Sequence, residues 1–89
     1  MMIGLPMGFT TVQAFTAGPR SEGVVVGRKE LFPGTPHSRE EWVCWCTHIG
    51  SSGERDFYWG CYGSKEDALK SFDKRLPRYK DLRRYKEDA

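Results

Sequence analysis

One segment of this chain, residues 41–75, concentrates the side chains that most need to be buried. It holds all three tryptophans, all three cysteines and two of the four tyrosines. A buried aromatic side chain removes roughly 150–250 Å² of surface from water, so a few of them can anchor a small domain. What this chain can fold into therefore depends first on how this segment is arranged.

The segment has the pattern of a β-hairpin followed by a helix. Residues 41–49 and 57–62 are rich in β-branched, aromatic and cysteine side chains, and the glycine-bounded turn 50–53 lies between them. Ser64 is a candidate helix N-cap, because its hydroxyl can accept a hydrogen bond from the backbone N–H of Asp67. The apolar side chains that follow at helical spacing are Ala68, Leu69, Phe72 and Leu76.

Two shorter strands and a loop are predicted upstream. Residues 9–16 alternate in part, which places on one side of a strand Phe9, Thr11, Gln13 and Phe15. Residues 23–27 form a short apolar run between glycines. Residues 31–38 contain two prolines and a glycine, which is typical of a loop. At the other end, Pro77 either ends the helix or begins a second one.

These elements predict an α+β fold class: a small antiparallel sheet of three to four strands packed against one or two C-terminal helices. We expect a single domain over residues 1–89. Within it, residues 41–76 form the hairpin and helix unit, and residues 77–89 form a basic C-terminal segment.

The alternation within the hairpin predicts which face of the sheet the helix covers. Neighbouring side chains on a strand point to opposite faces. We expect the helix to cover the more apolar set, which is Val43, Trp45, Ile49, Phe57, Trp59 and Cys61, because this register separates apolar from polar side chains best. The other face then carries an amphipathic set of Trp42, Cys44, Cys46, His48, Tyr58 and Tyr62. Either the N-terminal strands and loop cover that face, or a second copy does in a homodimer.

Basic side chains are concentrated in the C-terminal part. Residues 1–64 contain five basic and six acidic residues, whereas residues 65–89 contain nine basic and six acidic residues. Such a stretch favours an anionic partner, either nucleic acid or an acidic protein surface, although a solvated helix face is the alternative. The residues predicted to contact a partner are Trp42, His48, Tyr58, Tyr62, Arg78, Lys80, Arg83, Arg84 and Lys86.

The thiols and histidines raise the question of a zinc site. Cys44, Cys46, His48 and Cys61 are the candidate ligands, with His37 in reserve. Residues i and i+4 on a strand are roughly 13 Å apart, so Cys44 and His48 cannot both bind one ion on a regular strand. A smaller subset with a facing residue stays open. Because the candidate ligands are spread along a strand, we expect no metal. The sequence also contains no recognisable P-loop, nucleophile–base pair or catalytic carboxylate pair, so we expect no cofactor and no enzymatic activity.

The expected location and redox environment follow from three patterns that the sequence does not match: a signal peptide, a membrane span and a disulfide framework. Its apolar start lacks the basic region of a signal peptide, and no apolar run approaches the about 20 residues that span a bilayer. Three cysteines is an odd number without the spacing of a disulfide framework. We expect a cytoplasmic protein that does not engage a membrane.

Three motifs resemble small accessory proteins of bacteriophages and prophages. They are W-V-x-W at residues 42–45, F-Y-W-G-x-Y at residues 57–62 and S-K-E-D-A-L-K-S-F-D-K-R at residues 64–75. The likeness covers residues 41–76. It implies a non-enzymatic binding protein that inhibits a bacterial defence or nucleic-acid-processing complex in the host cytoplasm, as anti-CRISPR proteins block a CRISPR effector.

The partner is then a host protein or nucleoprotein complex. The alternative function is a direct nucleic-acid-binding module that uses the aromatic side chains of the sheet and the basic C-terminal segment.

Overall fold

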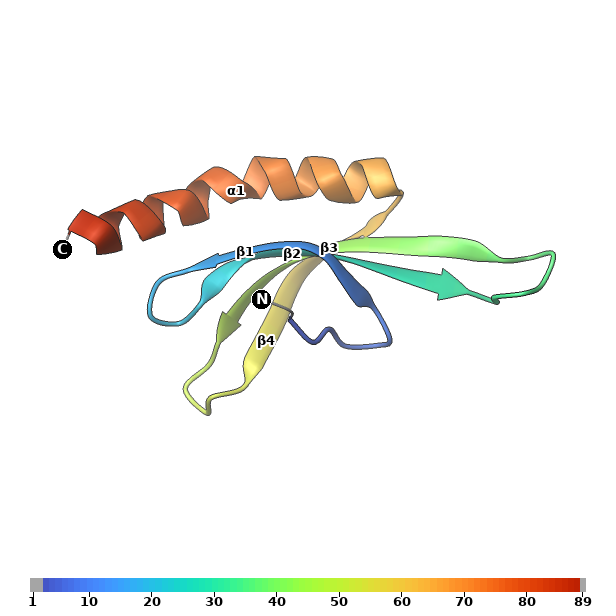
Figure 1. The fold of residues 1–89 in the computed structure, drawn as a ribbon, viewed down its shortest axis with the longest axis horizontal. Coiled ribbons are helices and arrows are strands. Elements are labelled where there is room, and N and C mark those ends of the chain that lie inside the picture. Colours follow the sequence, from blue (N-terminus) through green and yellow to red (C-terminus); the bar gives the residue numbers. More distant parts are fainter. Residues whose placement is uncertain (1–2, 89) are drawn as a thin grey trace.

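The computed structural model describes the backbone of residues 3–88 and the side chains of residues 3–80. Four antiparallel strands form one sheet in the order β1-β2-β3-β4, and a single helix follows them. The elements are β1 (Thr10–Ala17), β2 (Glu22–Leu31), β3 (Arg39–Ile49), β4 (Arg55–Gly63) and α1 (Lys65–Asp88). Figure 1 shows α1 lying across one face of the sheet. The predicted α+β class, with its antiparallel sheet and C-terminal helix, is confirmed.

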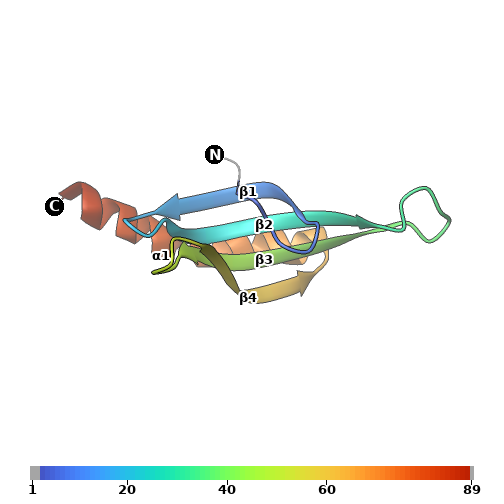
Figure 2. The same cartoon turned by 90° about the horizontal axis from the view of Figure 1, so that it is seen from below.

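The molecule is elongated, with extents of 54 × 28 × 20 Å. At one end the last turns of α1 extend past the sheet, and at the other end the β2–β3 hairpin extends past the helix (Figures 1 and 2). We call this projecting hairpin, residues 28–41, the β2–β3 arm. The predicted loop lies at its tip, except that Leu31 still belongs to β2.

Both faces of the sheet are covered, each by a different part of the chain. The helix-side cluster contains Val24, Val26, Trp42, Cys44, Cys46, Ala68, Phe72 and Tyr79. The far-side cluster contains Phe9, Val25, Val43 and Trp45, with Leu5, Ala14 and Phe57 packed against it. The N-terminal segment passes over this second face, opposite α1 (Figure 1). The prediction that the N-terminal strands and loop cover the second face is right only in that an N-terminal part of the chain does so. The covering part is the segment before β1, whereas β1 and β2 extend the sheet and the predicted loop lies at the tip of the β2–β3 arm.

The prediction of which face α1 covers is wrong. The helix packs on the face of Trp42, Cys44 and Cys46, and the two thiol residues are 0% and 2% exposed. Cysteine behaves as a small apolar residue when it is buried, so a face that alternation marks as amphipathic can be core. The bulkier Val43 and Trp45 face is sealed by the N-terminal segment instead.

A β-bulge in β4 changes the alternation along that strand. Trp59 and Gly60 together oppose the single residue Trp45 of β3. Downstream of the extra residue, Cys61 lies on the helix face and Tyr62 lies on the far face. The prediction groups Cys61 with Val43 and groups Tyr62 with Cys44, and both groupings are wrong, because Cys61 pairs with Cys44 and Tyr62 pairs with Val43. The predicted register separates apolar from polar side chains best only if β4 is a regular strand, and the bulge makes β4 irregular.

A second bulge in β1 has the same effect. Val12 is an extra residue, because Thr11 and Gln13 pair with consecutive residues of β2. Phe9 consequently belongs to the far-side cluster, while Phe15 packs against the helix-side cluster. The prediction that these two aromatic residues share one side is wrong for this reason.

The helix begins as predicted but does not end as predicted. The hydroxyl oxygen of Ser64 accepts a hydrogen bond of 3.2 Å from the backbone N–H of Asp67. The helix then continues through Pro77 to Asp88, so Pro77 neither ends it nor starts a second one. A proline inside a helix removes one hydrogen bond and displaces the carbonyl four residues earlier, which agrees with the bend of α1 near its middle (Figure 1).

Candidate functional site

An open groove of about 410 Å³ lies between α1 and the β3–β4 side of the sheet. We call it the Trp59 groove. Helical spacing brings residues 71, 74, 75 and 78 to one face of α1, so they form one wall of the groove. The residues that line it are Cys46, Trp59, Ser71, Lys74, Arg75, Arg78 and Tyr79. The lining contains three cationic side chains and no carboxylate.

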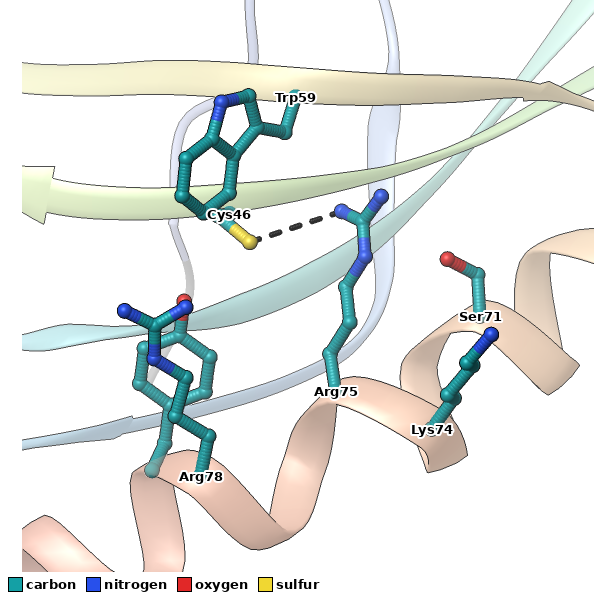
Figure 3. Close-up of a pocket in the computed structure, with 7 residues that line it drawn as sticks. Cys46, Trp59, Ser71, Lys74, Arg75 and Arg78 are labelled. Atoms are coloured by element: carbon teal, nitrogen blue, oxygen red, sulfur yellow. Dashed lines mark hydrogen bonds between the residues drawn. The ribbon is translucent and has the colours of Figure 1, made fainter.

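Trp59 is the most unusual residue of this groove. It is 62% exposed, and its φ of 54° lies in the left-handed region that bulky residues rarely adopt. The next residue has no room for a side chain, because a Cβ at Gly60 would lie 2.7 Å from Nε1 of Trp45. The bulge therefore brings the backbone of Gly60 close to a buried ring and leaves the Trp59 ring outside the sheet core, facing the helix (Figure 3).

Two arginines point from the helix toward the sheet (Figure 3). The guanidinium carbon of Arg78 lies 5.9 Å from the centre of the Trp59 ring, in cation–π geometry. Arg75 donates from Nη1 to the backbone oxygen of Cys44 at 3.4 Å and contacts Sγ of Cys46 at 3.6 Å. Both cations are therefore oriented before any ligand arrives. Lys74 is exposed and has no such restraint among the contacts described.

The floor of the groove is neutral. Tyr79 and Cys46 are 3% and 2% exposed. Burial, reinforced by the neighbouring Cys46 thiol, raises the pKa of the Tyr79 phenol well above its ordinary value. Burial likewise raises the pKa of the Tyr58 phenol, which lies beside Trp59 at a ring-centre distance of 5.1 Å. The charge of the groove thus comes from its cations alone, and the arrangement suits a planar or anionic ligand.

The structure separates the aromatic residues predicted to contact a partner. Trp42 is 6% exposed and lies in the helix-side cluster, so its predicted place on a binding face is corrected. Tyr62 is 52% exposed on the far face, where its ring meets those of Phe9 and Trp45. His48 and Tyr58 are half-buried neighbours, with ring centres 5.2 Å apart, near the groove.

The basic residues predicted to contact a partner also fall into separate groups. Arg78 lines the Trp59 groove, whereas Lys80 is exposed on α1 and does not line it. The side chains of Arg83, Arg84 and Lys86 lie outside those that the structure describes. Of the six predicted contact residues whose side chains the structure describes, the groove therefore contains Arg78, with Tyr58 beside it.

The sequence prediction missed Trp59, Lys74 and Arg75 as site residues. Strict alternation assigned Trp59 to the core. The signal that could have identified it is Gly60, because an isolated glycine inside a strand pattern often marks a bulge. The spacing of residues 74, 75 and 78 would have grouped the cations on one helix face.

Among the described residues, no three histidine, cysteine or acidic side chains gather where they could hold a metal ion. Cys44 and Cys46 lie beneath α1, and Cys61 is exposed on β4. Over the same residues, no helix combines the length and apolar character that crossing a membrane requires.

Comparison with known proteins yields no match: no family model, no curated protein and no solved structure is significantly similar to this chain. Any function must therefore be argued from the groove itself.

Proposed function

We propose that this protein is a non-enzymatic nucleic-acid-binding protein that holds single-stranded DNA or RNA in the Trp59 groove. The observation that carries the proposal is an exposed indole ring facing three cations across an open groove. Stacking of a base on an aromatic side chain is worth about 1–3 kcal/mol, and it tolerates any base sequence. Lys74, Arg75 and Arg78 would neutralise the neighbouring phosphates.

The chemistry of the groove favours a single strand over a duplex. Bases inside a duplex are already stacked on each other and offer no free face to Trp59. The sequence of α1 also stays basic beyond the groove, at residues 83, 84 and 86. A continuing basic helix suits a polymer with many phosphates better than a single free nucleotide.

The test is fluorescence anisotropy of labelled single-stranded and duplex oligonucleotides. Trp59→Ala should weaken single-strand binding about tenfold or more, because it removes the stacking surface. Tyr62→Ala is the matched control, since it removes an exposed aromatic ring from the same strand on the opposite face. Equal affinity for duplex and single strand, or wild-type binding by Trp59→Ala, would contradict the proposal.

Salt dependence tests the role of the cations. Binding releases counterions from phosphates, so the affinity should fall steeply with salt concentration. Arg78→Ala and Lys74→Ala should each reduce the slope of log affinity against log salt by about one. Lys80→Ala serves as the control, because Lys80 is exposed on α1 outside the groove.

The β2–β3 arm favours a second function. We propose, as this second candidate, that the protein inhibits a bacterial defence or nucleic-acid-processing complex, such as a CRISPR effector, by protein contact at the arm tip. Phe32 at the tip is 60% exposed with a φ of 54°, so it too is a bulky apolar residue kept in water and in the left-handed region. Its carbonyl accepts a hydrogen bond of 2.8 Å from the Thr35 hydroxyl, which orders the tip.

Cleavage assays with a purified CRISPR effector nuclease separate the two candidates. Inhibition near one protein per effector, lost in Phe32→Ala and kept in Trp59→Ala, would support contact through the arm. The opposite pattern would assign any inhibition to the Trp59 groove. Unchanged cleavage at a large excess of protein would reject that effector as the target.

A further inference from the structure

Two cysteines lie directly opposite each other beside the bulge that carries Trp59. Cys44 of β3 and Cys61 of β4 are paired in the antiparallel register, and both are free thiols. Opposed residues of such a pair point to the same face, with Cβ atoms about 4.5–5.5 Å apart. A disulfide joins Cβ atoms about 3.5–4.5 Å apart, so a small local adjustment would bring the two sulfurs into bonding distance.

The two thiols differ in access. Cys61 is exposed on the edge strand, whereas Cys44 is 0% exposed beneath α1. Burial raises the pKa of the Cys44 thiol. A reagent in solution therefore meets Cys61 first, and Cys44 is placed to react second, with the sulfur of Cys61.

We propose that Cys44 and Cys61 form a dithiol pair that a low-molecular-weight disulfide, such as glutathione disulfide, converts to a cross-strand disulfide. In the first step the Cys61 thiolate attacks one sulfur of glutathione disulfide. The S–S bond of the reagent breaks, one glutathione leaves as a thiolate that takes up a proton, and Cys61 carries a mixed disulfide.

In the second step the Cys44 thiol gives up its proton to solvent, and its thiolate attacks the sulfur of Cys61. The second glutathione leaves and is protonated. Over both steps, two protein thiols lose two protons and two electrons, and one glutathione disulfide is reduced to two glutathione thiols. No other oxidant is required.

The third cysteine provides an internal control. Cys46 pairs across the sheet with Tyr58 rather than with a thiol. Cys44 and Cys46 are two residues apart on one strand, so their Cα atoms are about 6.6 Å apart and their side chains run parallel. That is a poor geometry for a disulfide. The register therefore selects one pair out of the three that three cysteines allow.

The experiment treats the reduced protein with glutathione disulfide, quenches it with acid and measures the intact mass and the peptides released without reductant. The wild type and Cys46→Ala should lose the mass of two hydrogens and yield a peptide that links Cys44 to Cys61. Cys44→Ala should stop at a single glutathione adduct on Cys61. Cys61→Ala should remain unmodified under conditions that fully convert the wild type.

Two results would overturn the proposal. One is a wild-type protein that keeps glutathione on Cys61 without cross-linking, and the other is a cross-link that includes Cys46. Peptide mapping of the wild type alone detects both, so the test does not depend on whether a variant folds. The urea midpoint of the oxidised wild type should also exceed that of the reduced protein, since a cross-link in native register restrains the unfolded chain. These measurements are independent of nucleic-acid binding.

Discussion

At the scale of single residues, Trp59 is held under two unfavourable conditions. Its backbone lies in the left-handed region, and more than half of the residue's surface is exposed to water. The usual residue at the first position of such a bulge is glycine, which adopts this conformation without steric cost. Within the fold the ring contacts Tyr58 and Arg78, and the proposed stacking ligand would add a further contact on its exposed surface.

Comparing two substitutions at this position isolates the backbone cost. We expect Trp59→Gly to be more stable than Trp59→Ala by about 1 kcal/mol in urea denaturation, because only glycine relieves the left-handed strain. Both variants should lose single-strand binding to the same extent. A variant pair of equal stability would show that the backbone at residue 59 relaxes out of this conformation once the indole ring is removed.

The buried Cys44 thiol and Tyr79 phenol should make the free energy of unfolding depend on pH in the alkaline range. The ordinary pKa values of the Cys44 thiol and the Tyr79 phenol are 9.0 and 10.0, and burial raises both in the folded protein. The unfolded chain therefore loses these protons first as the pH rises. Their contribution is complete below the ordinary values and is lost above them, so the free energy of unfolding should fall as the pH rises beyond 9.0.

Tyr79→Phe checks this assignment, because it keeps the aromatic ring and removes the phenolic hydroxyl. The fall of the urea midpoint between about pH 8 and pH 11 should be shallower in this variant than in the wild type. Tyr62→Phe, which removes a phenolic hydroxyl from a half-exposed position, is measured alongside as the control. Parallel profiles for Tyr79→Phe and the wild type would assign the alkaline effect to other groups.

At the scale of elements, the sequence predicts those features of the fold that depend only on residues close together along the chain. The turn at residues 50–53, the cap at Ser64 and the existence of the strands all follow from local patterns, and the structure contains each of them. The faces of β1 and β4 do not follow, because one extra residue reverses every side chain beyond it. Whether a strand has a bulge is decided across the sheet, where Gly60 meets Trp45.

The sequence does not predict the Trp59 groove, because alternation along β4 does not reveal the bulge. Alternation assigned Trp59 to the core and Trp42 to the surface, and the structure has them the other way round. Only Arg78 was predicted among the residues that line the groove. Its neighbours Lys74 and Arg75 become a site only when α1 lies on the sheet, and no local pattern specifies that face.

Gly60 is the residue on which the β4 bulge depends. We expect Gly60→Ala to cost about 1–3 kcal/mol of stability, because the added methyl group would lie 2.7 Å from Nε1 of the buried Trp45 ring and force the ring or the strand to shift. Gly4→Ala is the control, since a Cβ at that position meets nothing within 4 Å. Thermal or urea denaturation measures both, and equal stability of the two variants would contradict the close approach at Gly60.

At the scale of the whole molecule, the two layers that cover the sheet are unequal. A long helix covers one face, and a short N-terminal segment that includes Leu5 and Phe9 covers the other. This segment is fixed at a few points. The hydroxyl of Thr11 donates to the backbone oxygen of Ile3 at 2.6 Å, and Nζ of Lys29 donates to that of Met7 at 3.0 Å.

Deleting residues 2–9 should therefore uncover the far-side cluster, because it removes both Leu5 and Phe9. We expect the shortened chain to bind an apolar dye and to self-associate in analytical ultracentrifugation, because Val43 and Trp45 would lose their cover. Met7→Ala is the control, as its side chain is 59% exposed. A homodimer of the full chain stays a prediction, and the same sedimentation run on the wild type tests it.

The strained position of Trp59 also has a genetic consequence. The tryptophan codon differs from one glycine codon by a single base, and glycine is the residue that this backbone accepts most readily. One point mutation can therefore give a protein that folds at least as well as the alanine variant but lacks the stacking surface. If the proposed binding role holds, lineages released from it would be expected to lose this tryptophan early, so retention of an aromatic residue at this position among relatives would support the proposed use of the groove.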